Sequence, residues 1–146
     1  MGNMAQIKHS ILIQAPAERI HPLVASANGF TQWWAADVTE TDGVVELGFF
    51  KRATIFRLQP TRIDPPREAQ WLCMSGHEWQ DTKLLFNLAV GQPGQTLLHF
   101  THADWREETE YFVSCTTTWG ELMFRIKAAA EGKALGPLFS ATGMGY

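Results

Sequence analysis

The first regular pattern in the chain is an alternation of apolar and polar side chains from Gln6 to Gln14. Successive side chains of a β-strand point to opposite faces, so this alternation predicts a half-buried strand. One face of the strand would point to the core, and it consists of Ile7, His9, Ile11 and Ile13.

Two short helices are expected after this strand. Pro16 suits the first position of a helix, and Glu18 suits its first turn because the helix dipole favours an acidic side chain there. Pro22 is expected to end or kink this helix, since proline lacks a backbone donor. A second helix is predicted from Asn28 to Trp34, with Asn28 as its N-cap.

The middle of the chain is a succession of short strand-like runs bounded by turn residues. These runs cover residues 44–50, 54–63 and 69–75. Residues 81–104 predict a β-hairpin around the loop GQPGQ. On its inner face we expect one strand to contribute Leu84, Phe86 and Leu88, and the other to contribute Leu98, Phe100 and His102.

The last long element is predicted as one amphipathic helix from Glu107 to Gly132. Its apolar residues recur at spacings of three and four, which places them on one face. Residues 136–146 are rich in glycine, and their pattern predicts no conformation. The apolar stripe of the helix consists of Phe112, Cys115, Thr116, Trp119, Leu122, Met123 and Ile126.

The order of these elements indicates a single α+β domain with an antiparallel sheet. It comprises a strand, two short helices, about six strands in hairpin succession and one long helix. A twisted sheet of this length curls, and the long helix would bury its stripe against the concave face. Where the short helices close the open end, a cavity often remains between sheet and helix.

Trp33 and Trp34 are adjacent, so on a helix or strand the two rings could not face the same way. We expect one ring to pack beneath the second short helix and Trp34 to point into the cavity. The alternative is that both rings join the short helices to the sheet.

Composition and charge narrow the classes of function. The chain has 146 residues, of which 45% are hydrophobic and 18% charged, as in a globular domain. A net charge of −3 and a pI near 5.9, with no run of Lys and Arg, disfavour nucleic acid and anionic membranes as partners. No apolar stretch is long enough for membrane insertion or a signal peptide, so we expect a soluble cytoplasmic protein. Cys73 and Cys115 are expected to be reduced core thiols.

His102 is the candidate catalytic residue, because it lies on a predicted inward face with Asp104 two positions on. The alternative is a hydrogen-bonded core histidine. His99 would point to the opposite face of the same strand, so the two histidines could not share a metal ion. His77 and Glu78 lack the HExxH spacing of a zinc site, and we expect neither metal nor cofactor.

Four stretches of the chain resemble the START-like (SRPBCC) superfamily, which has the helix-grip fold. They are ILIQAPAERIHPLV, the Trp33 and Trp34 pair, TLLHFTHADW and SCTTTWGELMFRIKAAAEGK. The resemblance extends from Lys8 to Lys133 and favours the branch of homologues of the activator of heat-shock-chaperone ATPase, which neighbours the polyketide cyclases. Those activators carry an additional N-terminal domain, for which 146 residues leave no room. The resemblance therefore implies a fold and a cavity more than chaperone activation.

The resemblance implies a curved antiparallel sheet of six to seven strands wrapped on a C-terminal helix. It also implies an apolar small-molecule ligand, because members of the superfamily bind lipids, sterols, polyketides and other apolar molecules. The alternatives are a cofactor-independent cyclase or hydrolase and a chaperone-linked or stress-response interaction module. A homodimer is left open, and the aromatic side chains could instead fill the core completely. The predicted ligand-binding residues are Trp34, Phe49, Phe56, Trp71, Phe86, Phe100, His102, Phe112, Thr116, Trp119 and Met123.

Overall fold

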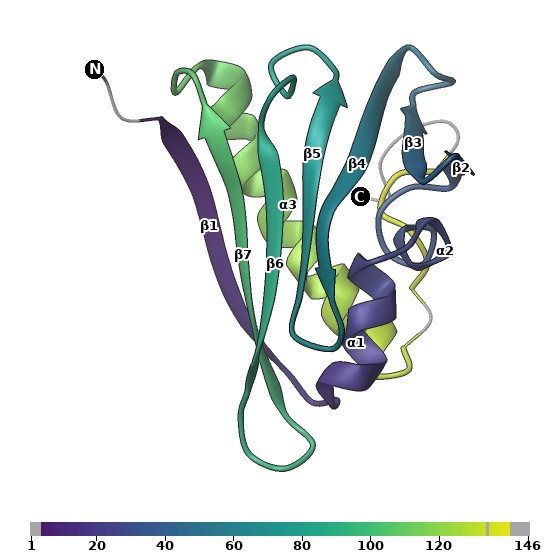
Figure 1. The fold of residues 1–146 in the computed structure, drawn as a ribbon, viewed down its shortest axis with the longest axis vertical. Coiled ribbons are helices and arrows are strands. Elements are labelled where there is room, and N and C mark those ends of the chain that lie inside the picture. Colours follow the sequence, from purple (N-terminus) through teal and green to yellow (C-terminus); the bar gives the residue numbers. More distant parts are fainter. Residues whose placement is uncertain (1–3, 134, 141–146) are drawn as a thin grey trace.

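A seven-stranded antiparallel sheet curls around one long helix in the computed structural model, which describes residues 4–133 and 135–140 (Figure 1). The strand order is β1-β7-β6-β5-β4-β3-β2, so every pair except β1 and β7 is consecutive in the chain. This architecture confirms the predicted fold class. The elements are β1 (Ala5–Ile13), α1 (Ala17–Val24), α2 (Ala27–Phe30), β2 (Asp37–Thr41), β3 (Val44–Phe49), β4 (Thr54–Asp64), β5 (Glu68–Ser75), β6 (Lys83–Val90), β7 (Thr96–Trp105) and α3 (Glu110–Ala130).

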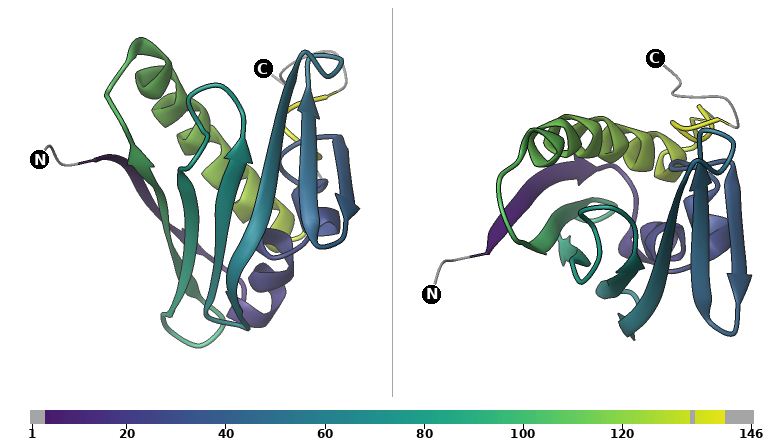
Figure 2. Two further views of the ribbon diagram at one scale, coloured as in Figure 1. Left: turned by 45° about the horizontal axis from the view of Figure 1, so that its top comes forward. Right: turned by 90° about the horizontal axis from the view of Figure 1, so that it is seen from above.

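The three helices lie on the concave side of the sheet. Figure 2 shows α3 running along the inside of the curve, with α1 and α2 on the same side near its C-terminal end. No helix within the described part of the chain is both long and apolar enough to cross a membrane.

The hairpin of β6 and β7 has the register that its alternating pattern predicts. Leu84 pairs with His102, Phe86 with Phe100 and Leu88 with Leu98. All six side chains are buried, because this face of both strands points to α3.

A β-bulge near the end of β7 changes which side chains point inward. β1 pairs Ile7 with His102 but Ala5 with Trp105, so β7 has one extra residue between the two pairs. Asp104 takes a positive φ of 70° in this bulge, and its carboxylate lies 3.6 Å from the Lys83 ammonium. The extra residue lets both His102 and Trp105 point to the core, whereas a regular strand would place them on opposite faces.

The long helix α3 begins three residues later than predicted. The Thr109 hydroxyl accepts a hydrogen bond from Phe112 N at 3.1 Å, which makes Thr109 the N-cap. Gly132, with φ +84°, lies just beyond the helix end, as its pattern suggested. Six members of the predicted stripe are buried, namely Phe112, Cys115, Trp119, Leu122, Met123 and Ile126.

The last turn of α1 has its carbonyl groups capped by side chains. Pro22 lies inside α1 and does not end it; the helix continues to Val24. The indole N–H of Trp33 donates to Leu23 O at 2.8 Å, and that of Trp71 donates to Val24 O at 2.9 Å. Carbonyls at the end of a helix lack partners within it, so Trp71 fixes α1 to β5 and Trp33 fixes α1 to the segment after α2.

The second helix is shorter than predicted and begins earlier. Its N-cap is Ser26, whose hydroxyl accepts from Gly29 N at 3.0 Å, so the prediction of Asn28 as the cap is wrong. The helix ends at Phe30, and residues 31–34 form a turn. The N-cap therefore lies two residues before the one predicted, because a serine side chain accepts well at this position.

Gly29 allows α1 and α2 to meet at backbone contact. A Cβ at Gly29 would overlap the Pro22 carbonyl oxygen and lie 2.6 Å from Leu23 Cα. We expect Gly29→Ala to lower the free energy of unfolding by about 1–3 kcal/mol, the usual result of overpacking, when urea denaturation is measured.

Gly120→Ala is the matched control for this prediction. The new Cβ in the middle of α3 would meet His9 Cε1 at 3.6 Å, an ordinary contact. Alanine favours a helix over glycine, so this variant should gain about 0.5–1 kcal/mol. Equal stabilities for the two variants would contradict the close approach of α1 and α2.

Candidate ligand-binding site

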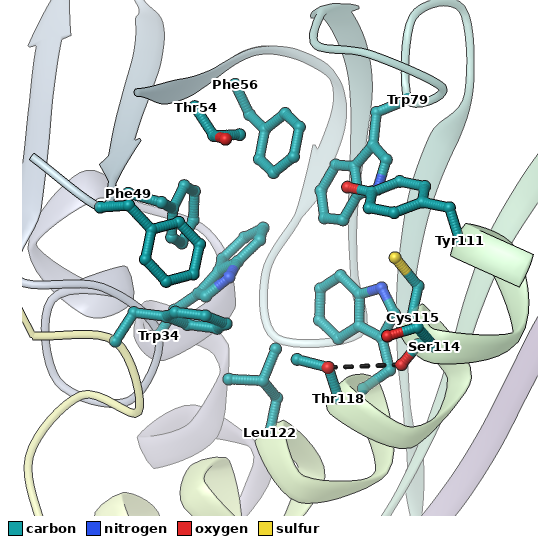
Figure 3. A pocket seen from close by; sticks show the side chains of 13 residues that line it. Trp34, Phe49, Thr54, Phe56, Trp79, Tyr111, Ser114, Cys115, Thr118 and Leu122 are labelled. Carbon is teal, nitrogen blue, oxygen red and sulfur yellow. Dashed lines mark hydrogen bonds between the residues drawn. The ribbon is translucent and has the colours of Figure 1, made fainter. Parts of the chain in front are cut away.

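A cavity of about 170 Å³ lies between α3 and the β3–β4 end of the sheet (Figure 3). Its wall combines the sheet, the turn after β5, the helix and the segment after α3. Eight of its lining side chains are aromatic: Trp34, Phe49, Phe50, Phe56, Trp79, Tyr111, Trp119 and Phe139. The others are Leu122, Thr54, Ser114, Cys115 and Thr118.

The cavity is lined by four of the residues predicted to bind a ligand. These are Trp34, Phe49, Phe56 and Trp119. Seven others lie away from its wall: Trp71, Phe86, Phe100, His102, Phe112, Thr116 and Met123. Most of these seven are core residues beneath the cavity, as Phe100 illustrates with its ring centroid 4.1 Å from that of Trp119.

Thr116 does not line the cavity, and its hydroxyl donates to Val113 O within the helix at 2.5 Å. Its carbonyl accepts a hydrogen bond from His9 Nε2 at 3.1 Å, which links α3 to β1. The neighbouring Thr118 lines the cavity instead. A helix turns about 100° per residue, so two positions along α3 are enough to change the surface that a side chain meets.

Trp33 and Trp34 stack on each other, with centroids 5.3 Å apart and planes at 14°. Both are fully buried. The two rings can stack face to face because their residues belong to a turn. In a strand or helix, neighbouring side chains would point in different directions. Trp34 lines the cavity, whereas Trp33 caps α1. Both rings also lie between a short helix and the sheet, as in the alternative: each contacts Phe30 of α2, Trp33 contacts Phe86 of β6, and Trp34 contacts Phe49 of β3.

The segment after α3 holds the double tryptophan in place. Leu138 N donates to Trp33 O at 3.1 Å and Phe139 N donates to Trp34 O at 2.9 Å. Ala36 N donates in turn to Phe139 O, which completes a short parallel bridge. Phe139 thereby reaches the cavity wall. The sequence did not predict this role, because apolar residues in the glycine-rich tail do not recur at the spacing of a helix or strand. Met144 and Tyr146 of the tail lie outside the described residues.

The turn after β5 contributes Trp79, which the sequence analysis did not single out. Trp79 stacks on Phe56 with centroids 4.0 Å apart and planes at 3°. Gly76 has φ +114°, and the Phe56 ring occupies the place where a Cβ would lie. The glycine in the SGHEWQD turn could have indicated this contact in the sequence, because glycine is common where another residue approaches the backbone closely.

Two titratable side chains at the cavity stay protonated at neutral pH. Burial raises the pKa of the Cys115 thiol, and the nearby Trp79 N–H lowers it by less. Burial also raises the pKa of the Tyr111 phenol. Cys115 is therefore a neutral thiol and a weak nucleophile, because the thiolate is the reactive form.

His102 lies below the cavity in a completed hydrogen-bond chain. Trp119 Nε1–H donates to His102 Nδ1 at 3.1 Å, which leaves the ring proton on Nε2. Nε2–H donates to Thr82 Oγ1 at 2.8 Å, and Thr82 donates to Trp79 O at 2.5 Å. Both ring nitrogens have partners, as expected for the alternative of a hydrogen-bonded core histidine. Asp104 points to Lys83 on the outer side of the bulge.

The other candidate groups are dispersed. His77 lies 3.4 Å from Glu78 in the exposed part of the turn. Burial raises the pKa of the Cys73 thiol to about 12. Within residues 4–133 and 135–140, no three His, Cys, Asp or Glu side chains gather in a way that could hold a metal ion.

Comparison with solved structures identifies the fold. The Aha1 dimer from Colwellia psychrerythraea aligns with a TM-score of 0.79 at 25% identity, over 89% of this chain and 98% of that chain. A START superfamily protein from Mycobacterium smegmatis aligns with a TM-score of 0.68 at 14% identity, over 90% and 99% of the two chains. DynU16, from the dynemicin biosynthetic locus, aligns at 0.69 and 14% identity, over 88% of this chain and 48% of that chain.

These matches define the chain as a protein with the START-like helix-grip fold. Its structural neighbours include the Aha1 branch to which the sequence motifs pointed. No protein-family model matches the chain, and neither does any curated protein. The resemblance predicted from four short stretches is confirmed by the three-dimensional comparison.

The burial of His102 predicts a pH dependence of stability. Burial lowers the pKa of His102 from 6.5 to about 3, so the unfolded state binds more protons than the folded state between these values. The stability from the neutral ring is complete above the unfolded pKa and is lost as the pH falls. From pH 7 to pH 5, we expect His102 to remove about 2 kcal/mol from the free energy of unfolding, measured by urea denaturation.

The variant His102→Gln should lack this component of the pH dependence, whatever its stability at pH 7. His77→Gln, which alters an exposed histidine, is the control and should retain it. An equal pH dependence in the wild type and His102→Gln would contradict the neutral, buried ring.

Proposed function

We propose that the protein binds a small, neutral, apolar molecule with an aromatic ring in the cavity beside α3. The observation that carries this proposal is the composition of the wall. Aromatic rings and Leu122 form most of it, and the thirteen described residues that line it include no charged side chain. Pockets for small apolar ligands have this character, with a few polar groups that orient the ligand.

The size of the cavity supports a compact ligand. Its volume of about 170 Å³ is close to that of a dry engineered cavity of roughly 150 Å³ that binds benzene. One ring with a small substituent matches this space, whereas most of a lipid or multi-ring polyketide would remain outside. Of the ligand classes that the family resemblance implies, size therefore favours a single-ring aromatic metabolite.

The structural neighbours support a binding role in general terms. A START superfamily protein and a protein from a biosynthetic locus have the same fold, although their identity of 14% supports a shared fold alone. The cavity of this chain is what favours the ligand class.

A cyclase or hydrolase reaction has less support. His102 has partners at both ring nitrogens, and the Cys115 thiol and Tyr111 phenol keep their protons at neutral pH. An acid–base reaction needs a group whose pKa lies near the working pH. An interaction role, including a homodimer, is supported by the Aha1 dimer among the neighbours, and light scattering of the purified chain would test the dimer.

The proposal is tested by filling the cavity from its helical side. Thr118 lines the cavity from α3, and its side chain points into the space between the aromatic rings (Figure 3). We expect the wild type to bind toluene in isothermal titration calorimetry, and Thr118→Phe to weaken that binding by at least about tenfold. The stability change of this variant should stay within the usual range for overpacking, about 1–3 kcal/mol.

Thr117→Phe is the matched control, because Thr117 is exposed on α3 and does not line the cavity. It should bind toluene like the wild type. Raising the salt concentration should leave the affinity unchanged, since no charge takes part. Failure of the wild type to bind toluene, or equal binding by Thr118→Phe, would refute the proposed function.

A further inference from the structure

Trp79 carries a buried hydrogen-bond donor that has no acceptor. The indole N–H groups of Trp33, Trp71 and Trp119 each donate to a named acceptor, at 2.8, 2.9 and 3.1 Å. Among the buried side-chain nitrogens and oxygens that the structure describes, only Trp79 Nε1 and Trp105 Nε1 lack a partner. A buried donor without a partner is unfavourable, so an unpaired one calls for an explanation.

Trp79 differs from Trp105 because its ring lines the cavity. The Trp79 side chain is 5% exposed, and its ring is held by stacking on Phe56. Figure 3 shows the nitrogen edge of the indole turned toward Tyr111 and Cys115. The unpaired N–H is therefore part of the binding site, and its orientation is fixed before any ligand enters.

The Tyr111 oxygen and the Cys115 sulfur lie near this N–H but do not form a hydrogen bond with it, and both groups can donate hydrogens themselves. The Tyr111 hydroxyl and the Cys115 thiol both keep their protons at neutral pH, because burial raises the pKa of each. A phenol or thiol in this state offers a hydrogen that a ligand oxygen can accept. The polar corner of the cavity, defined as Trp79, Tyr111 and Cys115, thus presents hydrogens without a full positive charge. Such a corner suits a neutral acceptor better than a carboxylate, whose loss of water would not be compensated.

We infer that the ligand is an aromatic compound with a neutral hydrogen-bond acceptor, such as an aryl ketone, whose oxygen accepts the hydrogen bond of Trp79 Nε1–H. The ring occupies the apolar part of the cavity, between Trp34, Phe49 and Trp119. The oxygen lies at the polar corner, where Tyr111 is the second donor within reach. This inference rests on the proposed function and adds an orientation and a chemical class to it.

The test compares two ligands of nearly the same shape. Acetophenone has a carbonyl oxygen where α-methylstyrene has a methylene group, so only acetophenone can accept a hydrogen bond. Their affinities also differ because water solvates them differently. The measured quantity is therefore the ratio of the two dissociation constants, compared between protein variants, because the contribution of water then cancels.

Trp79→Phe keeps an aromatic ring but removes the N–H. We expect the preference for acetophenone over α-methylstyrene to fall by about tenfold in this variant, the usual range for one hydrogen bond. Trp105→Phe is the matched control, because it removes the other unpaired indole N–H, away from the cavity. It should keep the wild-type ratio. Tyr111→Phe should reduce the preference as well.

Nuclear magnetic resonance of the wild type gives a measurement that needs no variant. The assigned Trp79 indole N–H proton should shift downfield with acetophenone and move little with α-methylstyrene, since only the ketone accepts its hydrogen. Two results would overturn this inference and leave the proposed function intact, provided that both ligands bind. In the first, the ratio of the two dissociation constants is the same in the wild type and in Trp79→Phe. In the second, the preference for acetophenone falls as much in Trp105→Phe as in Trp79→Phe. Failure of both ligands to bind the wild type would overturn the proposed function itself.

Discussion

The contact between Trp119 and His102 is the interaction on which the rest of the structure depends. It joins the middle of α3 to the C-terminal part of β7 at a distance of 3.1 Å, and both side chains are buried. The chain of hydrogen bonds continues through Thr82 to the backbone of Trp79, so one network positions the helix, β7 and the turn after β5. Because a partly satisfied buried network is unfavourable, all three elements must be in place together. The base of the cavity is rigid for this reason.

Large flat rings explain why a cavity remains in a domain of this size. Trp34, Trp79 and Trp119 are held by backbone or side-chain partners and by stacking, and their centroids are 5.1 to 6.1 Å apart. Rings fixed in this way cannot relax into the space beside them, as flexible aliphatic side chains would. The same aromatic content that suggested a filled core thus produces an open space when its rings are fixed at several angles.

Periodic segments of the sequence were predicted well, and segments without a period were not. The alternation in β6 and β7 predicts the pairing of Phe86 with Phe100, because a one-residue slip would expose the whole apolar face. The stripe of α3 likewise predicts that Trp119 is central. Trp79 and Phe139 were missed, because turns and tails are arranged by tertiary contacts and not by a repeat along the chain. Tyr111 was missed because it lies in the first turn of α3, outside the apolar stripe that the helical spacing predicts. The bulge at Asp104 was missed for the same reason, since it exists only in the pairing of two strands.

The bridge between Phe139 and Trp34 has a consequence for the order in which the domain forms during synthesis. A ribosome releases the chain from its N-terminal end, so the sheet and α3 emerge before the segment that carries Leu138 and Phe139. Until that segment pairs with the backbone of Trp33 and Trp34, the double tryptophan lacks one of its anchors. The wall of the cavity therefore cannot be completed on a nascent chain until Phe139 has emerged, after every strand and helix of the domain.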